Sequence, residues 1–200
     1  MSIVWSLLWL WLLLDGVVQA AFAPADKAAL QAAVGTCEWS NCGTSGCLSE
    51  TSDGSCPIFA ASNDASGNPH GVIGEWDVSR VTSFESLFQK ANSFNSDISK
   101  WKPSRVTNMQ SMFSSAKTFN ADITLWNVSS VTNLESTFFY ASTFNQDIGN
   151  WSVSRVTTLK STFSEAKQFN HNLNNWITSK VTTMESTFGS AAFNQPLHSW

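Results

Sequence analysis

Two columns of charged side chains recur every 25 residues and are the first candidates for chemistry. The basic column contains Arg80, Arg105, Arg155 and Lys180, with Ser130 as its only neutral member. Like charges spaced along a rigid ladder can match a repeating anionic polymer, such as a sulfated or carboxylated glycan, or an acidic protein. The alternative is a solvated face that pairs with the acidic column of Glu85, Glu135 and Glu185, and such exposed pairs contribute little to stability.

A second acidic column contains Asp97, Asp122 and Asp147. Stacked carboxylates repel one another unless amides, cations or water compensate them. We favour turn capping as their role. The sharper alternative is calcium held between repeats by these oxygens.

The remaining titratable and nucleophilic residues do not indicate an enzyme. The three histidines, His70, His171 and His198, occupy different repeat positions, and no glycine-rich phosphate loop is present. The serines recur in register, as capping or turn residues do. Because no titratable groups converge on one pocket, we expect neither a catalytic residue nor a cofactor. The formal net charge of -4 also argues against a nucleic-acid partner.

A 25-residue repeat must position these columns. Within it, the apolar residues of segment 106–116 step by three or four, which predicts a short helical turn. Segment 123–128 predicts a short strand, which would lie parallel to its counterparts in a stack. We therefore expect an α/β repeat solenoid with one short strand and one short helix per coil. A structural ladder of tryptophans spaced 25 residues apart marks the repeat: Trp76, Trp101, Trp126, Trp151 and Trp176. Trp200 follows one residue earlier than this spacing predicts.

Other polar columns have structural interpretations. An amide ladder that satisfies backbone groups is predicted for the asparagines that follow each repeat's second phenylalanine: Asn95, Asn120, Asn145, Asn170 and Asn194. The threonine column of Thr82, Thr107, Thr132, Thr157 and Thr182 fits sheet packing, with an ice-binding face as the remote alternative. Asn127 and Asn150 begin sequons for N-glycosylation.

The residues before the repeats predict export and an N-terminal cap. Residues 1–20 resemble a signal peptide, because the apolar run at 7–14 is too short to span a bilayer. Residues 21–72 contain a predicted capped helix at 26–35 and four cysteines, Cys37, Cys42, Cys47 and Cys56. Two disulfides are favoured over a zinc site, because these cysteines include no close Cys-x-x-Cys pair. Residues 73–200 form the solenoid, and Trp200 begins a sixth unit, so we expect sequence beyond it.

The strings WDVSRVTSFESLF and FNADITLWNVSSVTNLESTF resemble the repeat of the BspA-like leucine-rich-repeat surface proteins. The resemblance implies a leucine-rich-repeat-like solenoid and surface display, adhesion or partner binding, without catalytic residues. We therefore predict a secreted or cell-surface, non-catalytic binding module for a protein or glycan partner, with no membrane span within the chain. A structural component of the cell wall or surface layer is the alternative.

Overall fold

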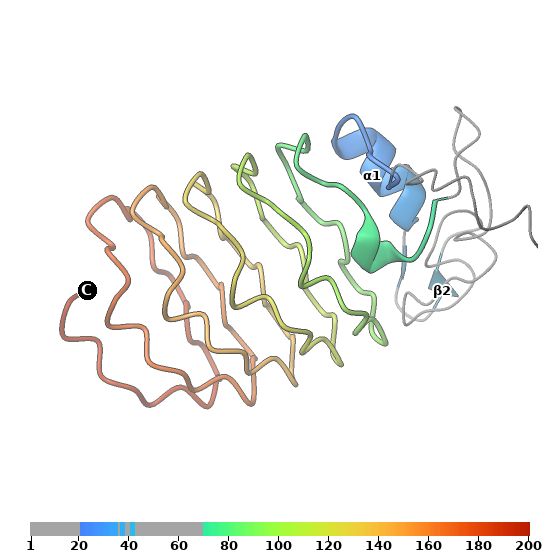
Figure 1. Cartoon of the computed structure of the whole chain (residues 1–200). Helices are drawn as coiled ribbons and strands as arrows, with labels where there is room; N and C mark the ends of the chain where they lie inside the picture. Colours follow the sequence, from blue (N-terminus) through green and yellow to red (C-terminus); the bar gives the residue numbers. More distant parts are fainter. Residues whose placement is uncertain (1–20, 36, 39–40, 43–69) are drawn as a thin grey trace, which may run out of the picture.

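The computed structural model of the chain describes residues 21–35, 37–38, 41–42 and 70–200. The predicted signal peptide, residues 1–20, lies outside the described residues. From residue 73 onward the chain winds into a stack of coils, with the C-terminus at the opposite end from helix α1 (Figure 1). We number the coils 1 to 5 and define each by its opening tryptophan: residues 76–100, 101–125, 126–150, 151–175 and 176–199.

Regular secondary structure is sparse in the described residues. The elements are α1 (Lys27–Val34), the antiparallel pair β1 (Cys37–Glu38) and β2 (Asn41–Cys42), and the 3-10 helix η1 (Ile73–Glu75). Within coils 1 to 5 the described chain contains neither a helix nor a strand, and the only strand-like pairing between successive coils is a series of isolated parallel bridges. The expected leucine-rich-repeat-like α/β solenoid, with a strand and a helix in each coil, is therefore wrong.

The segment expected to be helical is a run of tight turns. Met112 N–H donates to Met109 O at 3.1 Å and Ala116 N–H donates to Phe113 O at 3.0 Å, each three residues back. Between them, Ser111 N–H donates to Glu135 O of the next coil at 2.9 Å. Alternate amides thus bond within a coil and between coils, which replaces the helical pattern. Ser111 adopts φ 56°, the left-handed value that the third residue of a type II turn requires.

The segment expected to be a strand is also a turn. Trp126 N–H donates to Ile123 O at 3.1 Å, and Ser129 N–H donates to the side-chain oxygen of Asn127 at 3.1 Å. The parallel contact between coils lies instead at the column that begins Ser83, Asn108 and Asn133. Equivalent residues therefore sit over one another, as the repeat predicts, but in turns and bridges rather than in a sheet.

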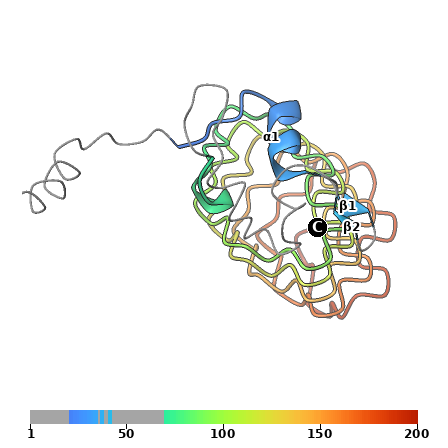
Figure 2. The same ribbon diagram turned by 90° about the vertical axis from the view of Figure 1, so that its right-hand side faces the viewer.

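Viewed from the end, the coils lie one behind another (Figure 2). Stacked aromatic side chains fill their interior. Phe113 stacks on Phe138 of the next coil at 5.7 Å and on Phe119 of its own coil at 3.7 Å between ring centroids. The indoles of Trp101 and Trp126 stack at 6.2 Å with 6° between their planes. The predicted tryptophan ladder is buried in the core at all five positions, Trp76, Trp101, Trp126, Trp151 and Trp176.

Helix α1 covers the end of the stack nearest the N-terminus (Figure 1). Its caps are those predicted: the Asp26 carboxylate accepts from Ala29 N at 2.9 Å, and Gly35 ends the helix with φ 82°. Leu30 and Val34 are buried with the residues of coil 1 in one hydrophobic core. The helix thereby shields the apolar face that coil 1 would otherwise expose.

Candidate binding surface

The basic side chains are positioned by a turn that recurs in each coil. Val106 N–H donates to Pro103 O at 2.9 Å, and Val156 N–H donates to Val153 O at 2.9 Å. The valine that closes the turn is buried in coils 1 to 4 and partly buried in coil 5, and the cation directly before it is exposed. The predicted binding residues Arg80, Arg105, Arg155 and Lys180 all occupy this exposed position. We call these four side chains the basic row.

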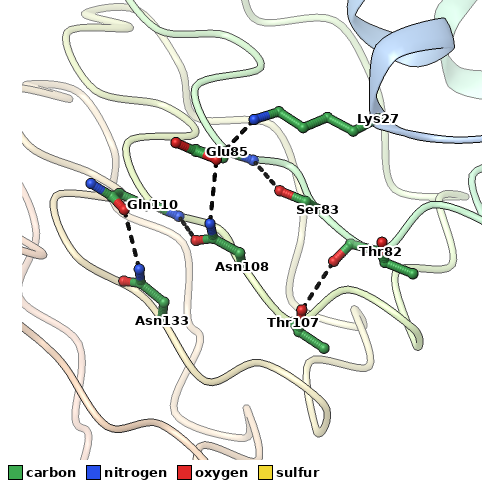
Figure 3. A network of polar contacts seen from close by, with 8 residues as sticks. All are labelled: Lys27, Thr82, Ser83, Glu85, Thr107, Asn108, Gln110 and Asn133. Carbon is green, nitrogen blue, oxygen red and sulfur yellow. Dashed lines mark hydrogen bonds and ion pairs between the residues drawn. The ribbon is translucent and has the colours of Figure 1, made fainter.

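The threonine column runs beside the basic row and holds the coils in register. Thr107 N–H donates to Thr82 O at 2.8 Å, and Thr107 Oγ1 lies 3.2 Å from the same oxygen (Figure 3). Thr132, Thr157 and Thr182 repeat both bonds with N···O distances of 2.8 Å. Because backbone and hydroxyl both donate to the preceding coil, the backbone spacing of the neighbouring basic residues is fixed.

The basic row has a gap at coil 3. Ser130 replaces the cation there, and its Oγ donates to Ser104 O of coil 2 at 2.7 Å. The row therefore consists of one pair of adjacent cations, Arg80 and Arg105, and a second pair, Arg155 and Lys180. The gap also shows that the fold accepts a neutral residue at this position.

The acidic column does not neutralise the basic row in the described part of the chain. Glu85 instead bonds to Lys27 of α1 at 2.8 Å and lies 3.5 Å from the Asn108 amide (Figure 3). Glu185 pairs with Lys160 at 3.4 Å. None of the four salt bridges found among the described residues includes a member of the basic row.

The charge of the basic row affects the pKa of one nearby carboxylate, that of Asp77. Hydrogen bonds from the side chain and the backbone N–H of Ser79 lower the pKa of Asp77, and the charges of Lys102 and Arg80 lower it further. Asp77 therefore remains ionised beside the row over the physiological range.

The second acidic column caps turns. Asp97 accepts from Ser99 N at 2.9 Å, Asp122 from Thr124 N at 2.9 Å, and Asp147 from Gly149 N at 3.1 Å. The hydrogen bonds from Ser99 and Thr124 lower the pKa of Asp97 and of Asp122, respectively. Within the described residues, no three histidine, cysteine or acidic side chains converge as a metal site would need. The geometry of these carboxylates is that of turn capping.

The asparagine column forms the predicted amide ladder. Asn120 N–H donates to the side-chain oxygen of Asn95 at 2.7 Å, and Asn145 N–H donates to that of Asn120 at 2.9 Å. The same bond links Asn170 to Asn145 and Asn194 to Asn170. These side chains therefore bond to the backbone between coils.

The other predicted sites are exposed or lie outside the described residues. Asn127 and Asn150, the sequon asparagines, are both exposed. Only the backbone of Cys37 and Cys42 is described, and these two residues face each other across β1 and β2. Cys47 and Cys56 lie outside the described residues, so the predicted disulfides involve side chains that are not described.

A pocket on another part of the coils was missed by the sequence analysis. Lys90, Lys117, Phe139 and Tyr140 line a cavity of about 370 Å³, together with Asn92 and Ser115. Its signal was available in the sequence: Phe139 and Tyr140 stand where the neighbouring coils have serine, at Ser114 and Ser115 and at Ser164. We had searched for columns that recur, and these residues interrupt two of them.

No helix in the described ranges has the length and apolar character needed to cross a bilayer. In comparisons with known proteins, the family described as "Mycoplasma protein of unknown function, DUF285" matches residues 63–135 and 121–200. No curated protein and no solved structure matches the chain.

Proposed function

Since the chain belongs to the DUF285 family, which leaves its activity open, we propose that it is an exported, non-catalytic module that binds a partner with repeated anionic groups. The partner is a sulfated or carboxylated glycan, or an acidic protein segment, at the cell surface or outside the cell. The observation that carries the proposal is the basic row, four exposed cations without a salt bridge among the described residues. The resemblance of the repeats to those of BspA-like surface proteins supports export.

The basic row is not needed to build the stack. Ser130 occupies the same position in coil 3 and adds a hydrogen bond to Ser104 O. Two unit charges about 6 Å apart in water repel each other by roughly 0.7 kcal/mol. Adjacent arginines therefore disfavour the folded state slightly where serine would not. A ligand with matching negative charges would reverse the sign of this interaction.

The rigidity of the row favours binding. The paired hydrogen bonds of the threonine column fix each coil against the next, so the backbone that carries the cations needs little reorganisation to meet a linear ligand. A site ordered before binding loses less entropy on association. We expect a polymer chain to bind along the stack rather than around a coil.

Retention on a heparin-type column tests the proposal. Arg105→Ser with Arg155→Ser copies Ser130 and removes two cations from the row. Lys160→Gln with Lys167→Ser is the matched control, because it removes the same charge from lysines that already pair with Glu185 and Glu165. It also copies residues from other coils, Gln110 and Ser142.

The row variant should elute at clearly lower salt than the wild type, and the control should elute close to it. Circular dichroism establishes that both variants keep the fold. Equal shifts for both variants would mean that the column reads net charge alone, and an unchanged row variant would remove the row as the binding surface.

A further inference from the structure

Phe139 and Tyr140 occupy positions that the fold does not reserve for aromatic residues. At the first position the other coils have Gln89, Ser114, Ser164 and Gly189, and at the second they have Lys90, Ser115, Glu165 and Ser190. The stack therefore forms with small or polar residues at both positions. An aromatic pair that the architecture does not require needs another explanation.

The backbone presents Tyr140 in a conformation that disfavours a bulky residue. Tyr140 is the third residue of a turn closed by Ala141 N–H and Phe138 O at 3.1 Å, and its φ is 57°. This left-handed conformation is unfavourable for any residue other than glycine. Its N–H donates to Ser164 O of coil 4 at 2.9 Å, which holds the turn in place.

The two rings form a rigid apolar wall at the surface. Their centroids lie 5.3 Å apart with 62° between the planes, an edge-to-face contact that fixes one ring against the other. Tyr140 remains 44% exposed despite this contact. An exposed ring held by a neighbour can bind a ligand without losing much side-chain entropy.

Two lysines from earlier coils complete the pocket. Lys90 belongs to coil 1 and Lys117 to coil 2, and both line the cavity of about 370 Å³ in front of the rings. This volume lies at the small end of the range for ligand pockets, about 300–1,000 Å³. The pocket is therefore suited to one or two small cyclic units with a negative charge, rather than to an extended surface.

We propose that this pocket binds a carboxylated sugar residue, as found in a uronic-acid polymer. The C–H face of a pyranose ring packs against the electron-rich face of an aromatic ring. A carboxylate on that sugar would pair with the ammonium group of Lys117. An acidic peptide offers the same charge, but it lacks the flat C–H face that the aromatic wall fits. The proposal deepens the proposed function, because it names a ligand class for a second site of a glycan-binding module.

Isothermal titration calorimetry on the full chain with three probes tests the proposal. Trigalacturonate presents both the pyranose face and the carboxylate. Its methyl ester keeps the ring without the charge, and triglutamate keeps the charge without the ring. We expect trigalacturonate to bind at least tenfold more tightly than either of the other probes.

The variants copy residues from neighbouring coils, so that the fold is preserved. Phe139→Ser with Tyr140→Ser copies the Ser114–Ser115 pair, and Lys117→Ser copies Ser142. Each variant should weaken trigalacturonate binding at least tenfold. The control variant, Lys160→Gln with Lys167→Ser, should bind trigalacturonate as the wild type does, because neither lysine lines the pocket.

Several results would overturn the proposal. They are absence of trigalacturonate binding, equal binding by the Phe139→Ser/Tyr140→Ser variant, or triglutamate binding as tight as that of the sugar. If these occur while the row variant still loses heparin retention, the pocket assignment fails and the proposed function stands. If pocket binding persists while the row variant keeps heparin retention, the row fails and the pocket stands.

Discussion

Trp126 donates its indole N–H at 3.2 Å to the carbonyl oxygen of Ile98, which lies in the equivalent turn one repeat earlier. The same oxygen accepts the backbone N–H of Trp101 at 3.1 Å. A buried carbonyl thus has both of its lone pairs satisfied, one within its own turn and one by the tryptophan of the equivalent turn in the next repeat. The arrangement recurs for Trp101, Trp151 and Trp176, whose indoles donate to Ile73, Ile123 and Ile148.

We predict that Trp126→Phe destabilises the stack by about 1 to 3 kcal/mol, because it removes the indole donor and leaves Ile98 O with a single partner. Lost ring volume adds to this cost. Urea unfolding followed by the fluorescence of the remaining tryptophans measures the change. Trp200→Phe is the control, since Trp200 makes the same bond to Leu173 O at 3.1 Å but is only partly buried. Equal losses for both variants would contradict the role assigned to burial.

We predict that the serines with positive φ tolerate substitution by glycine but not by valine. Ser136 has φ 54°, so Ser136→Gly stabilises the folded state by relieving about 1 to 2 kcal/mol of conformational strain. The greater freedom of glycine in the unfolded chain opposes this by about 0.4 to 1 kcal/mol. We expect a thermal midpoint equal to or above that of the wild type. Ser136→Val should lower it clearly, because a β-branched residue does not tolerate positive φ.

Ser152, an exposed residue without positive φ, is the control position for this pair. There the order should reverse, with valine tolerated and glycine slightly destabilising. If glycine and valine ranked the same way in stability at Ser136 and Ser152, the positive φ of Ser136 would not explain the effect of the substitutions.

These serines also explain which part of the fold was predictable. The 25-residue period placed equivalent residues over one another, and that register is confirmed by the bridges from Ser83 through Thr183. Local conformation was not predictable in the same way, because apolar steps of three or four arise both from a helix and from successive tight turns. The choice depends on whether an amide such as Ser111 N–H finds its acceptor within its coil or in the next one. That acceptor, Glu135 O, is 24 residues away.

The candidate sites divide along the same line. Exposure of the basic row follows from its place directly before an apolar valine in every repeat, so the row could be predicted from the sequence. The pocket combines Lys90 with Tyr140, two coils later, and forms only when the stack has closed. A search for recurring columns could not identify it, since its aromatic residues are those that break the pattern.

We predict that the capping aspartates make stability depend on acid pH. Hydrogen bonds from Thr124 hold the pKa of Asp122 below its ordinary value, against smaller opposing contributions from burial and from the charge of Asp97. Between the depressed pKa of Asp122 and the ordinary pKa of an aspartate, the unfolded chain binds more protons than the folded chain. The free energy of unfolding therefore falls as pH decreases below about 4. The stabilisation is fully present above that value and is lost as pH drops through the depressed pKa.

Urea unfolding at several pH values between about 2 and 7 measures this dependence. Asp122→Asn should reduce the acid sensitivity and keep the turn, because it copies Asn172, whose side-chain oxygen accepts from Asn174 N at 2.8 Å. Asp122→Ala should be less stable than the wild type even at pH 7, since it loses the capping oxygen. An unchanged pH profile in Asp122→Asn would exclude Asp122 as a source of the acid sensitivity.

We predict that one buried position accepts proline and another does not. Pro103 occupies a column that is valine at Val78, Val128 and Val153, and none of these valines donates a backbone hydrogen bond among the described residues. Val153→Pro should therefore change the free energy of unfolding by less than about 1 kcal/mol, because the restricted unfolded chain offsets lost side-chain packing. Val156→Pro, three residues later, removes the 2.9 Å bond from Val156 N to Val153 O. It should cost about 2 to 3 kcal/mol. Equal costs for the two variants in urea unfolding would show that the turn that carries Arg155 does not depend on this hydrogen bond.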